Sequence, residues 1–193
     1  MQKWIIIGVL VVLVLWIFSS YNGLVNKDEA VSSQWANVES QYQRRMDLIP
    51  NLVNTVKGYA DFEQETLTKV IEARSNATAV KIDPSNITPE ALAKFQQAQD
   101  GVSSTLGRLL VVMEKYPDLK ANQNFLDLQA QLEGTENRIA VERQRFNETA
   151  QTYNTATRRF PGVLIANLFG FERRGYFESV EGAEKAPTVD FGK

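Results

Sequence analysis

The sequence contains no histidine and no cysteine among its 193 residues. Without these side chains, Ser-His-Asp and Cys-His nucleophilic sites, the usual zinc sites and Glu-x-x-His di-iron sites are excluded. The absence of cysteine also excludes disulfide bonds and a lipoprotein anchor. Catalysis would have to rest on carboxylates, lysine, arginine, tyrosine or serine. We therefore predict a protein that is not an enzyme and that uses no cofactor and no metal.

The sequence also lacks an excess of charge of either sign, with 21 basic and 23 acidic residues. Nucleic-acid-binding proteins typically carry a basic stripe with interleaved aromatic residues, and no such stripe occurs in this sequence. No stretch alternates between apolar and polar residues as a half-buried strand does. Nucleic acid is therefore not an expected partner, and the expected fold class is all-α.

A long apolar run near the N-terminus is the first positive signal. With Ser19, Ser20 and Tyr21 it reaches about 18 residues, near the lower limit for spanning a bilayer. Aromatic residues lie near its two ends, where their rings favour the headgroup level. The predicted membrane span consists of Trp4, Ile5, Ile6, Ile7, Gly8, Val9, Leu10, Val11, Val12, Leu13, Val14, Leu15, Trp16, Ile17 and Phe18.

A cleaved signal peptide is the alternative interpretation of this run. The sequence that follows offers only Phe-Ser-Ser as a cleavage site, with a bulky residue where a small one is needed. We therefore favour an uncleaved anchor. Lys3 before the span and Lys27 behind it almost balance the positive-inside comparison, with a slight preference for an N-terminus in the cytoplasm and a folded part outside it.

Beyond the span, large side chains recur every three or four residues from Val31 to Arg74, which predicts one helix over about residues 24–75. Pro50 lies inside this pattern, and proline in a helix interior costs about 3 kcal/mol or more. The pattern keeps its phase across Pro50, so we favour one helix kinked at this residue. The alternative is a new helix capped by Asp47, with Pro50 in its first turn.

Further helices are predicted over about residues 89–116, 119–160 and 163–171. Thr88 followed by proline suits the start of the first of these. The next carries a column of large residues at seven-residue spacing, which is typical of a helix in a bundle: Phe125, Leu132, Ile139, Phe146, Tyr153 and Phe160. The prediction is a transmembrane anchor over residues 1–22, an elongated antiparallel up-and-down bundle over residues 23–172, and an extended tail over residues 173–193.

The lengths of the first two bundle helices predict an uncovered surface. At about 1.5 Å per residue the helix over residues 24–75 would be roughly 75 Å long, whereas that over residues 89–116 would reach only roughly 40 Å. Either the C-terminal tail or neighbouring copies would have to cover the membrane-proximal half, and we favour self-association into a homo-oligomer. The predicted self-association residues are Leu24, Val31, Trp35, Val38 and Tyr42.

Several polar residues are candidates for further roles. Glu136, Glu142 and Arg143 lie beside the seven-residue column and could form a buried polar layer, although ion pairs on a half-exposed helix face are the favoured interpretation. Asn147 and Asn154 could hydrogen-bond across helices. Three arginine pairs, at residues 44–45, 158–159 and 173–174, are interpreted as solvated charges at the edge of the core. Between the last two pairs, the apolar segment over residues 163–171 suits closure of the bundle, or else an interfacial helix.

Several longer segments resemble the LemA family of bacterial membrane-anchored proteins. They are "RRMDLIPNLVNTVKGYA", "YPDLKANQNFLDLQAQLEGTEN", "NRIAVERQRFN", "RRFPG" and the closing "APTVDF". The resemblance implies a helical bundle on one transmembrane helix in the bacterial inner membrane, with no established catalytic residues; some relatives are linked to membrane shaping. We predict a membrane-anchored scaffold that self-associates and organises membrane. The alternative is an adaptor for a membrane protease or signalling protein. The lipid bilayer is an expected partner in both cases.

Overall fold

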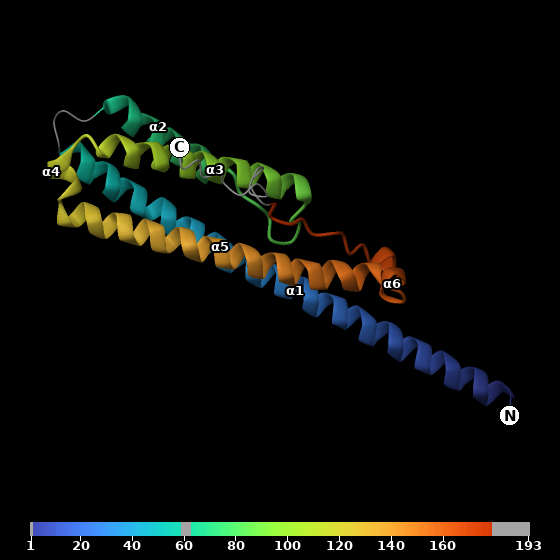
Figure 1. The fold of residues 1–193 in the computed structure, drawn as a ribbon. Coiled ribbons are helices and arrows are strands. Elements are labelled where there is room, and N and C mark those ends of the chain that lie inside the picture. Colours follow the sequence, from blue (N-terminus) through green and yellow to red (C-terminus); the bar gives the residue numbers. More distant parts are fainter. Residues whose placement is uncertain (1, 59–62, 179–193) are drawn as a thin grey trace, which may run out of the picture.

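The computed structural model describes residues 2–58 and 63–178, and within these ranges the chain is all-α, as predicted. The chain runs up along α1, back along α2, up again along α3 and down along α5, with α4 at a turn and α6 beyond the end of α5 (Figure 1). The elements of the described residues are α1 (Gln2–Lys57), α2 (Gln64–Ala79), α3 (Pro89–Met113), α4 (Pro117–Lys120), α5 (Gln123–Arg158) and α6 (Gly162–Phe169).

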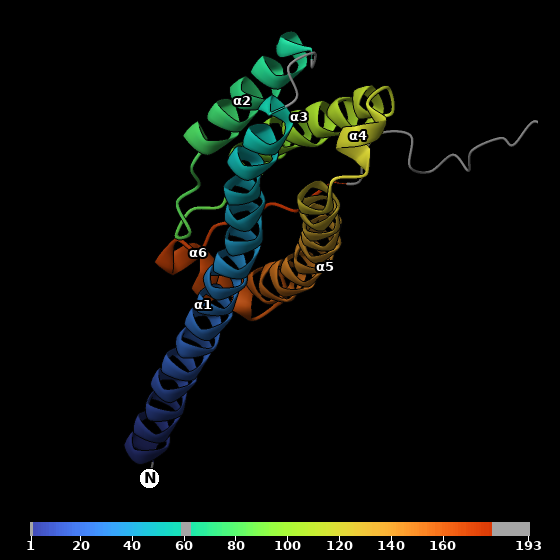
Figure 2. The same cartoon turned by 90° about the vertical axis from the view of Figure 1, so that its left-hand side faces the viewer.

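The long helices α1 and α5 lie against each other, and α2 lies against α3. The N-terminal end of α1 extends beyond every other element in both views (Figure 1, Figure 2). This end contains the predicted span, and its large side chains are exposed. Bundle and apolar end therefore share one continuous helix of 56 residues.

The predicted helix over residues 24–75 is wrong at its C-terminal end. The first helix ends at Lys57 and Gly58 forms a turn, after which residues 64–79 form the separate helix α2. The apolar spacing does not reveal this reversal, because α2 turns back and packs on the same core as α1. Leu67 and Val70 therefore continue the three- and four-residue spacing of the buried side chains of α1. Ala60, which has the same three- and four-residue spacing in the sequence, lies outside the described residues.

Side-chain caps define the starts of α3 and α5. The Thr88 hydroxyl accepts a hydrogen bond from the N–H of Ala91 at 3.2 Å, as the N-cap prediction requires. The Asn122 side chain accepts one from the N–H of Phe125, also at 3.2 Å. The four-residue helix α4 was not predicted, and it occupies the beginning of the region expected to form one helix over residues 119–160.

The core is built from seven-residue columns on α1 and α5. On α5 the predicted column is buried from Phe125 to Tyr153, whereas Phe160 lies beyond the helix and is exposed. A matching column runs along α1, and it contains one charged residue. Its members are Leu24, Val31, Val38, Arg45 and Leu52.

The residues predicted to form a self-association surface are buried within the single chain. Leu24, Val31, Trp35, Val38 and Tyr42 are each at most 4% exposed. Leu24 packs against α6, and the other four pack against α3, α5, the loop over residues 80–88 and Phe177. The prediction that these five side chains form an exposed surface is therefore wrong. The 36-residue helix α5 runs beside α1, and the chain after α5 returns over the membrane-proximal part, which was the alternative to self-association.

Pro50 lies in the interior of α1, so the alternative of a new helix beginning at Asp47 is wrong. A kink at Pro50 stays a prediction. Proline has no N–H, which leaves the carbonyl of Met46 without its usual helical donor. The Nε of Arg74 on α2 donates to this carbonyl at 2.9 Å. The returning helix thus replaces the hydrogen bond that Pro50 removes.

The burial of Trp35 predicts a loss of stability in the monomer. Trp35→Ala should lower the free energy of unfolding by about 3–5 kcal/mol, because it removes a fully buried indole that contacts Phe95 and Phe146. Chemical denaturation of the detergent-solubilised protein, followed by circular dichroism, measures this. Val111→Ala is the control, since Val111 is 72% exposed. Equal denaturation midpoints for the two variants would contradict the burial of Trp35.

The contact between Pro50 and Arg74 predicts a coupling between the two positions. Arg74→Met should cost about 1–2 kcal/mol, because it leaves the Met46 carbonyl without a donor. In a Pro50→Ala background the same substitution should cost much less, because an alanine restores the helical N–H. A double-mutant cycle of unfolding free energies measures the coupling. Identical costs in both backgrounds would show that the Arg74 bond does not replace the missing one.

Candidate functional site

A buried arginine joins three helices in the middle of the bundle. Arg45 is 1% exposed, and its guanidinium donates to Glu136 Oε1 at 2.6 Å and to Ser103 Oγ at 2.7 Å. It also donates to the side-chain oxygen of Gln99 at 2.6 Å and to its backbone carbonyl at 3.1 Å. These partners come from α3 and α5, so Arg45 fastens α1 to both helices. Sequence reasoning treated Arg45 as a solvated charge.

The Arg45 guanidinium also lies over the ring of Tyr42, 5.1 Å from its centroid. Burial raises the pKa of the Tyr42 hydroxyl, and the positive charges of Arg143 and Arg45 oppose this rise. Tyr42 therefore remains a neutral aromatic ring beside the arginine at neutral pH. A cation over an aromatic face is favourable, and more so where both are desolvated.

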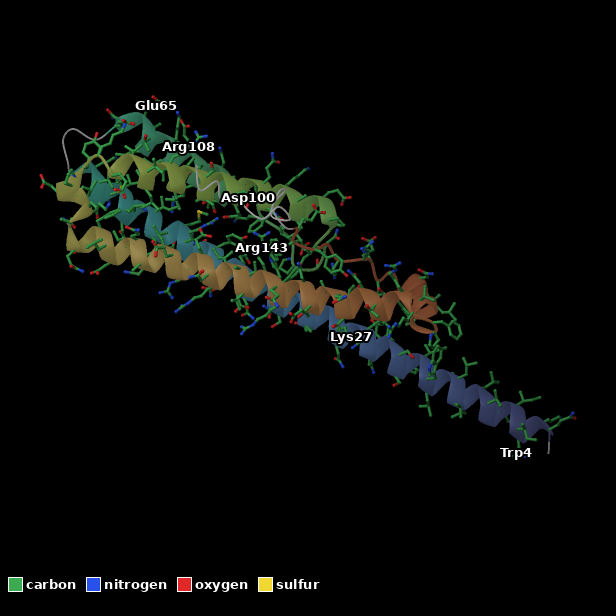
Figure 3. The ribbon with its side chains drawn as sticks, in the orientation of Figure 1. Trp4, Lys27, Glu65, Asp100, Arg108 and Arg143 are labelled. Atoms are coloured by element: carbon green, nitrogen blue, oxygen red, sulfur yellow. The ribbon has the colours of Figure 1, made fainter. Side chains whose placement is uncertain are left out.

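Glu136, Glu142 and Arg143 do not form a buried polar layer, and the favoured interpretation as ion pairs on a half-exposed helix face is confirmed for Glu136 and Glu142. Glu136 pairs with Arg45, whereas Glu142 accepts a hydrogen bond from Gln34 at 2.7 Å and forms an ion pair with Arg145 at 2.8 Å. Figure 3 labels Arg143 on α5 and Asp100 on α3, and these two helices lie on either side of residues 172–178. Arg143 donates to the backbone carbonyl of Glu178 at 3.0 Å.

Residues 172–178, here called the strap, form an extended segment that returns from α6 between α3 and α5 (Figure 1). Asn154 donates to the carbonyl of Arg174 and accepts from its N–H, both at 2.9 Å. Asn147 makes the same pair of bonds with Phe177, also at 2.9 Å. Gln96 on α3 binds the backbone of Glu178 in both directions, at 3.0 and 3.2 Å.

The spacing of the two asparagines explains why the strap fits. Seven helical residues rise about 10.5 Å, and three extended residues span about 10 Å. The separation of seven positions between Asn147 and Asn154 on the helix therefore matches the separation of three positions between Arg174 and Phe177 in the strap. The carboxamide side chains replace the backbone partners that a strand would have in a sheet. The sequence predicted cross-helix hydrogen bonds for both asparagines, but their partners belong to the strap.

Two strap side chains and one glycine secure this arrangement. Phe177 stacks on Trp35 with ring centroids 6.2 Å apart. The Arg174 guanidinium forms an ion pair with Asp28 at 2.6 Å and donates to the Ser85 carbonyl at 2.6 Å. Gly175 lies so close to α3 that a Cβ at this position would be 2.9 Å from the Pro89 Cα. Arg174 was predicted to be solvated and is instead 5% exposed.

Tyr153 ties the beginning of the strap to α5. Its hydroxyl donates to the Glu172 carbonyl at 2.9 Å. Burial and, to a smaller extent, the negative charge of Asp28 raise the pKa of Tyr153 to about 12, and the positive charge of Arg174 opposes this rise. The hydroxyl therefore keeps its proton at neutral pH and acts as a structural donor.

These polar residues hold elements of the fold together, and three of them, Asp28, Tyr153 and Arg174, also line a cavity of about 480 Å³. Within residues 2–58 and 63–178, no group of three or more carboxylates lies close enough to hold a metal ion. The N-terminal part of α1 is long and apolar enough to cross a membrane, with a mean hydropathy of 2.4 over a window that is not buried at all. This helix is compatible with a single-pass membrane anchor.

Fold and site together define an all-α protein in which a long apolar N-terminal helix continues into a bundle fastened by buried polar contacts. The sequence profile of the LemA family matches residues 34–191. The chain belongs to the LemA family, and the family match begins after the apolar part of α1.

The chain is also similar to individual members of known name. It is 29% identical over 185 residues to Magnetosome protein MamQ of Magnetospirillum gryphiswaldense, covering 87% of this chain and 68% of that protein. It is 29% identical over 175 residues to Magnetosome protein MamQ 2 of Paramagnetospirillum magneticum, covering 82% and 64%. It is 23% identical over 160 residues to Protein LemA of Metamycoplasma hominis, covering 83% and 69%. The chain thus spans about two thirds of these relatives.

The contrast between two adjacent arginines gives a sharp prediction. Arg45→Ala should cost about 3 kcal/mol or more, because it removes a buried guanidinium that pairs with Glu136 and leaves Gln99 and Ser103 without their donor. Arg44→Ala should change the free energy of unfolding by no more than about 0.5 kcal/mol, because Arg44 is exposed. Parallel denaturation of the two variants makes the comparison. A similar loss of unfolding free energy in both variants would show that Arg45 does not hold the helices together.

Proposed function

We propose that this protein is a non-enzymatic, membrane-anchored scaffold whose copies associate and organise membrane. The observation that carries the proposal is the continuity of α1, which is an exposed apolar helix at one end and the longest helix of the bundle at the other. Motion of the bundle is thereby transmitted directly to the membrane-spanning part. We place the anchor in the bacterial inner membrane, with the bundle outside the cytoplasm.

The non-enzymatic part of the proposal is supported by what the buried polar groups do. Arg45 binds α3 and α5, Arg174 binds α1 and the loop before α3, and Tyr153 holds the strap. In an active site such arginine and tyrosine side chains would be available to bind substrate, whereas here they form hydrogen bonds that hold the helices and the strap together. We accordingly expect no cofactor and no nucleic acid as partners.

Self-association requires a surface other than the buried stripe at Leu24–Tyr42. Exposed apolar side chains remain on the bundle, including Val111 on α3 and Leu126 and Val141 on α5. The apolar part of α1 is a second possible contact, within the bilayer. The similarity to proteins named for the magnetosome supports a role in organising membrane. The alternative is an adaptor that binds a membrane protease or signalling protein and forms no large assembly.

The number of copies in a membrane tests the proposal. The full-length chain is labelled at one introduced cysteine, Ser33→Cys, because Ser33 lies on the exposed face of α1. In lipid vesicles it should show several photobleaching steps per spot, and excess detergent should reduce these to one step. Lysine cross-linking in bacterial membranes should give mainly products of this chain with itself.

A single bleaching step at every protein density would contradict the scaffold proposal. If cross-linking in bacterial membranes then gives mainly products with other proteins, the adaptor alternative is correct. Trp35→Ala is not suitable for this test, because Trp35 stabilises the single chain.

A further inference from the structure

The helix α6 lies at the end of the bundle from which the apolar part of α1 emerges (Figure 1). One side of α6 is apolar and exposed. Leu164 and Leu168 lie four residues apart, on one side of the helix, and are 55% and 72% exposed. Phe160, just before α6, is 79% exposed. The opposite side of α6 is buried through Ile165 and Ala166, so closure of the bundle accounts for only half of this helix.

Contacts between α6 and α1 fix the level at which this face lies. Ile165 and Ala166 pack with Leu24, Ile17 and Tyr21 of α1. Phe169 contacts the ring of Tyr21 with centroids 4.8 Å apart. The exposed leucines of α6 therefore lie beside the part of α1 where its fully apolar sequence ends.

The chain after α6 holds the helix in this position. Gly170 adopts a left-handed conformation with φ of 74°, which ends the helix and turns the chain back towards the strap. The N–H of Phe171 then donates to the Ala166 carbonyl at 3.0 Å. Because the strap is bound along α5 by Tyr153 and Asn154, α6 is fixed at both ends.

We propose that α6 lies in the membrane interface, with Leu164, Leu168 and Phe160 inserted at the boundary between headgroups and acyl chains. This inference rests on the proposed membrane anchor and gives the bundle a second attachment to the same bilayer. A helix with one apolar side and polar surroundings binds lipid in this way. The occupant of this face is thus the lipid surface.

Continuity with the apolar part of α1 is the first reason for choosing lipid. The fifteen residues from Trp4 to Phe18 rise only about 22 Å, whereas the hydrocarbon core is about 30 Å thick. The region just beyond Phe18 must therefore lie near the bilayer boundary. The exposed face of α6 lies at this level, so it meets the same bilayer.

Charge is the second reason. Arg158 and Arg159 are exposed at the end of α5, immediately before Phe160. Guanidinium groups at this level can bind anionic headgroups while the neighbouring apolar side chains enter the membrane. The far end of the bundle, where α4 lies, is directed away from this boundary (Figure 1).

The absence of native cysteine allows a direct test with single labels on the full-length chain. Leu168→Cys carries an environment-sensitive fluorophore in vesicles of phosphatidylcholine and phosphatidylglycerol. Nitroxide groups high on the lipid acyl chains should quench this label several-fold more than the same label at Val111→Cys. Aqueous iodide should quench the two labels in the opposite order. Leu164→Cys repeats the measurement on the same face if Leu168→Cys does not fold.

A label at Leu10→Cys separates the inference from the function on which it rests. Quenching by lipid at position 10 but not at position 168 would leave the anchor in place and show that α6 is outside the membrane. No lipid quenching at position 10 would overturn both. A label at position 168 that neither lipid nor iodide quenches would show that protein covers α6, and this too would refute the inference.

Discussion

The structure depends on covering the apolar face of one very long helix. From Leu24 to Val56, α1 buries side chains turn after turn, and no single partner covers them all. The distal part is covered by α2, α3 and α5, the middle by α3, α5 and the strap, and the proximal end by α6. Because apolar burial is the main favourable term in folding, each returning segment is required to keep this face of α1 out of water.

Buried polar groups then decide how these segments are aligned. Apolar columns at seven-residue spacing would allow neighbouring helices to shift by one repeat with little change in burial. Arg45 prevents such a shift, since Gln99, Ser103 and Glu136 meet its guanidinium in only one register. Burying the Arg45 guanidinium costs desolvation that offsets much of the gain from its partners, and we infer that its main contribution is to the choice of register. Asn147 and Asn154 fix the register of the strap in the same way.

The sequence was sufficient for features that depend on local periodicity. These include the all-α class, the apolar N-terminal helix and the buried column of α5. It was insufficient where distant segments meet. The reversal after Lys57 left the apolar spacing unchanged, and the strap has no periodic pattern because its backbone carries most of the contacts. Arg45 was detectable in principle, because it lies seven residues from both Val38 and Leu52 in an otherwise apolar column.

The proposed membrane attachments have a mechanical consequence that neither would have alone. A bundle held by one helix could rotate about that helix and tilt with it, because a single span fixes neither angle. If α6 also rests in the interface, the line between α1 and α6 defines an orientation relative to the membrane plane. The strap joins α6 to α5 and α3, so this orientation extends to the whole bundle. A scaffold that organises membrane needs such a fixed angle, because copies with a common orientation can impose a common shape on the lipid beneath them.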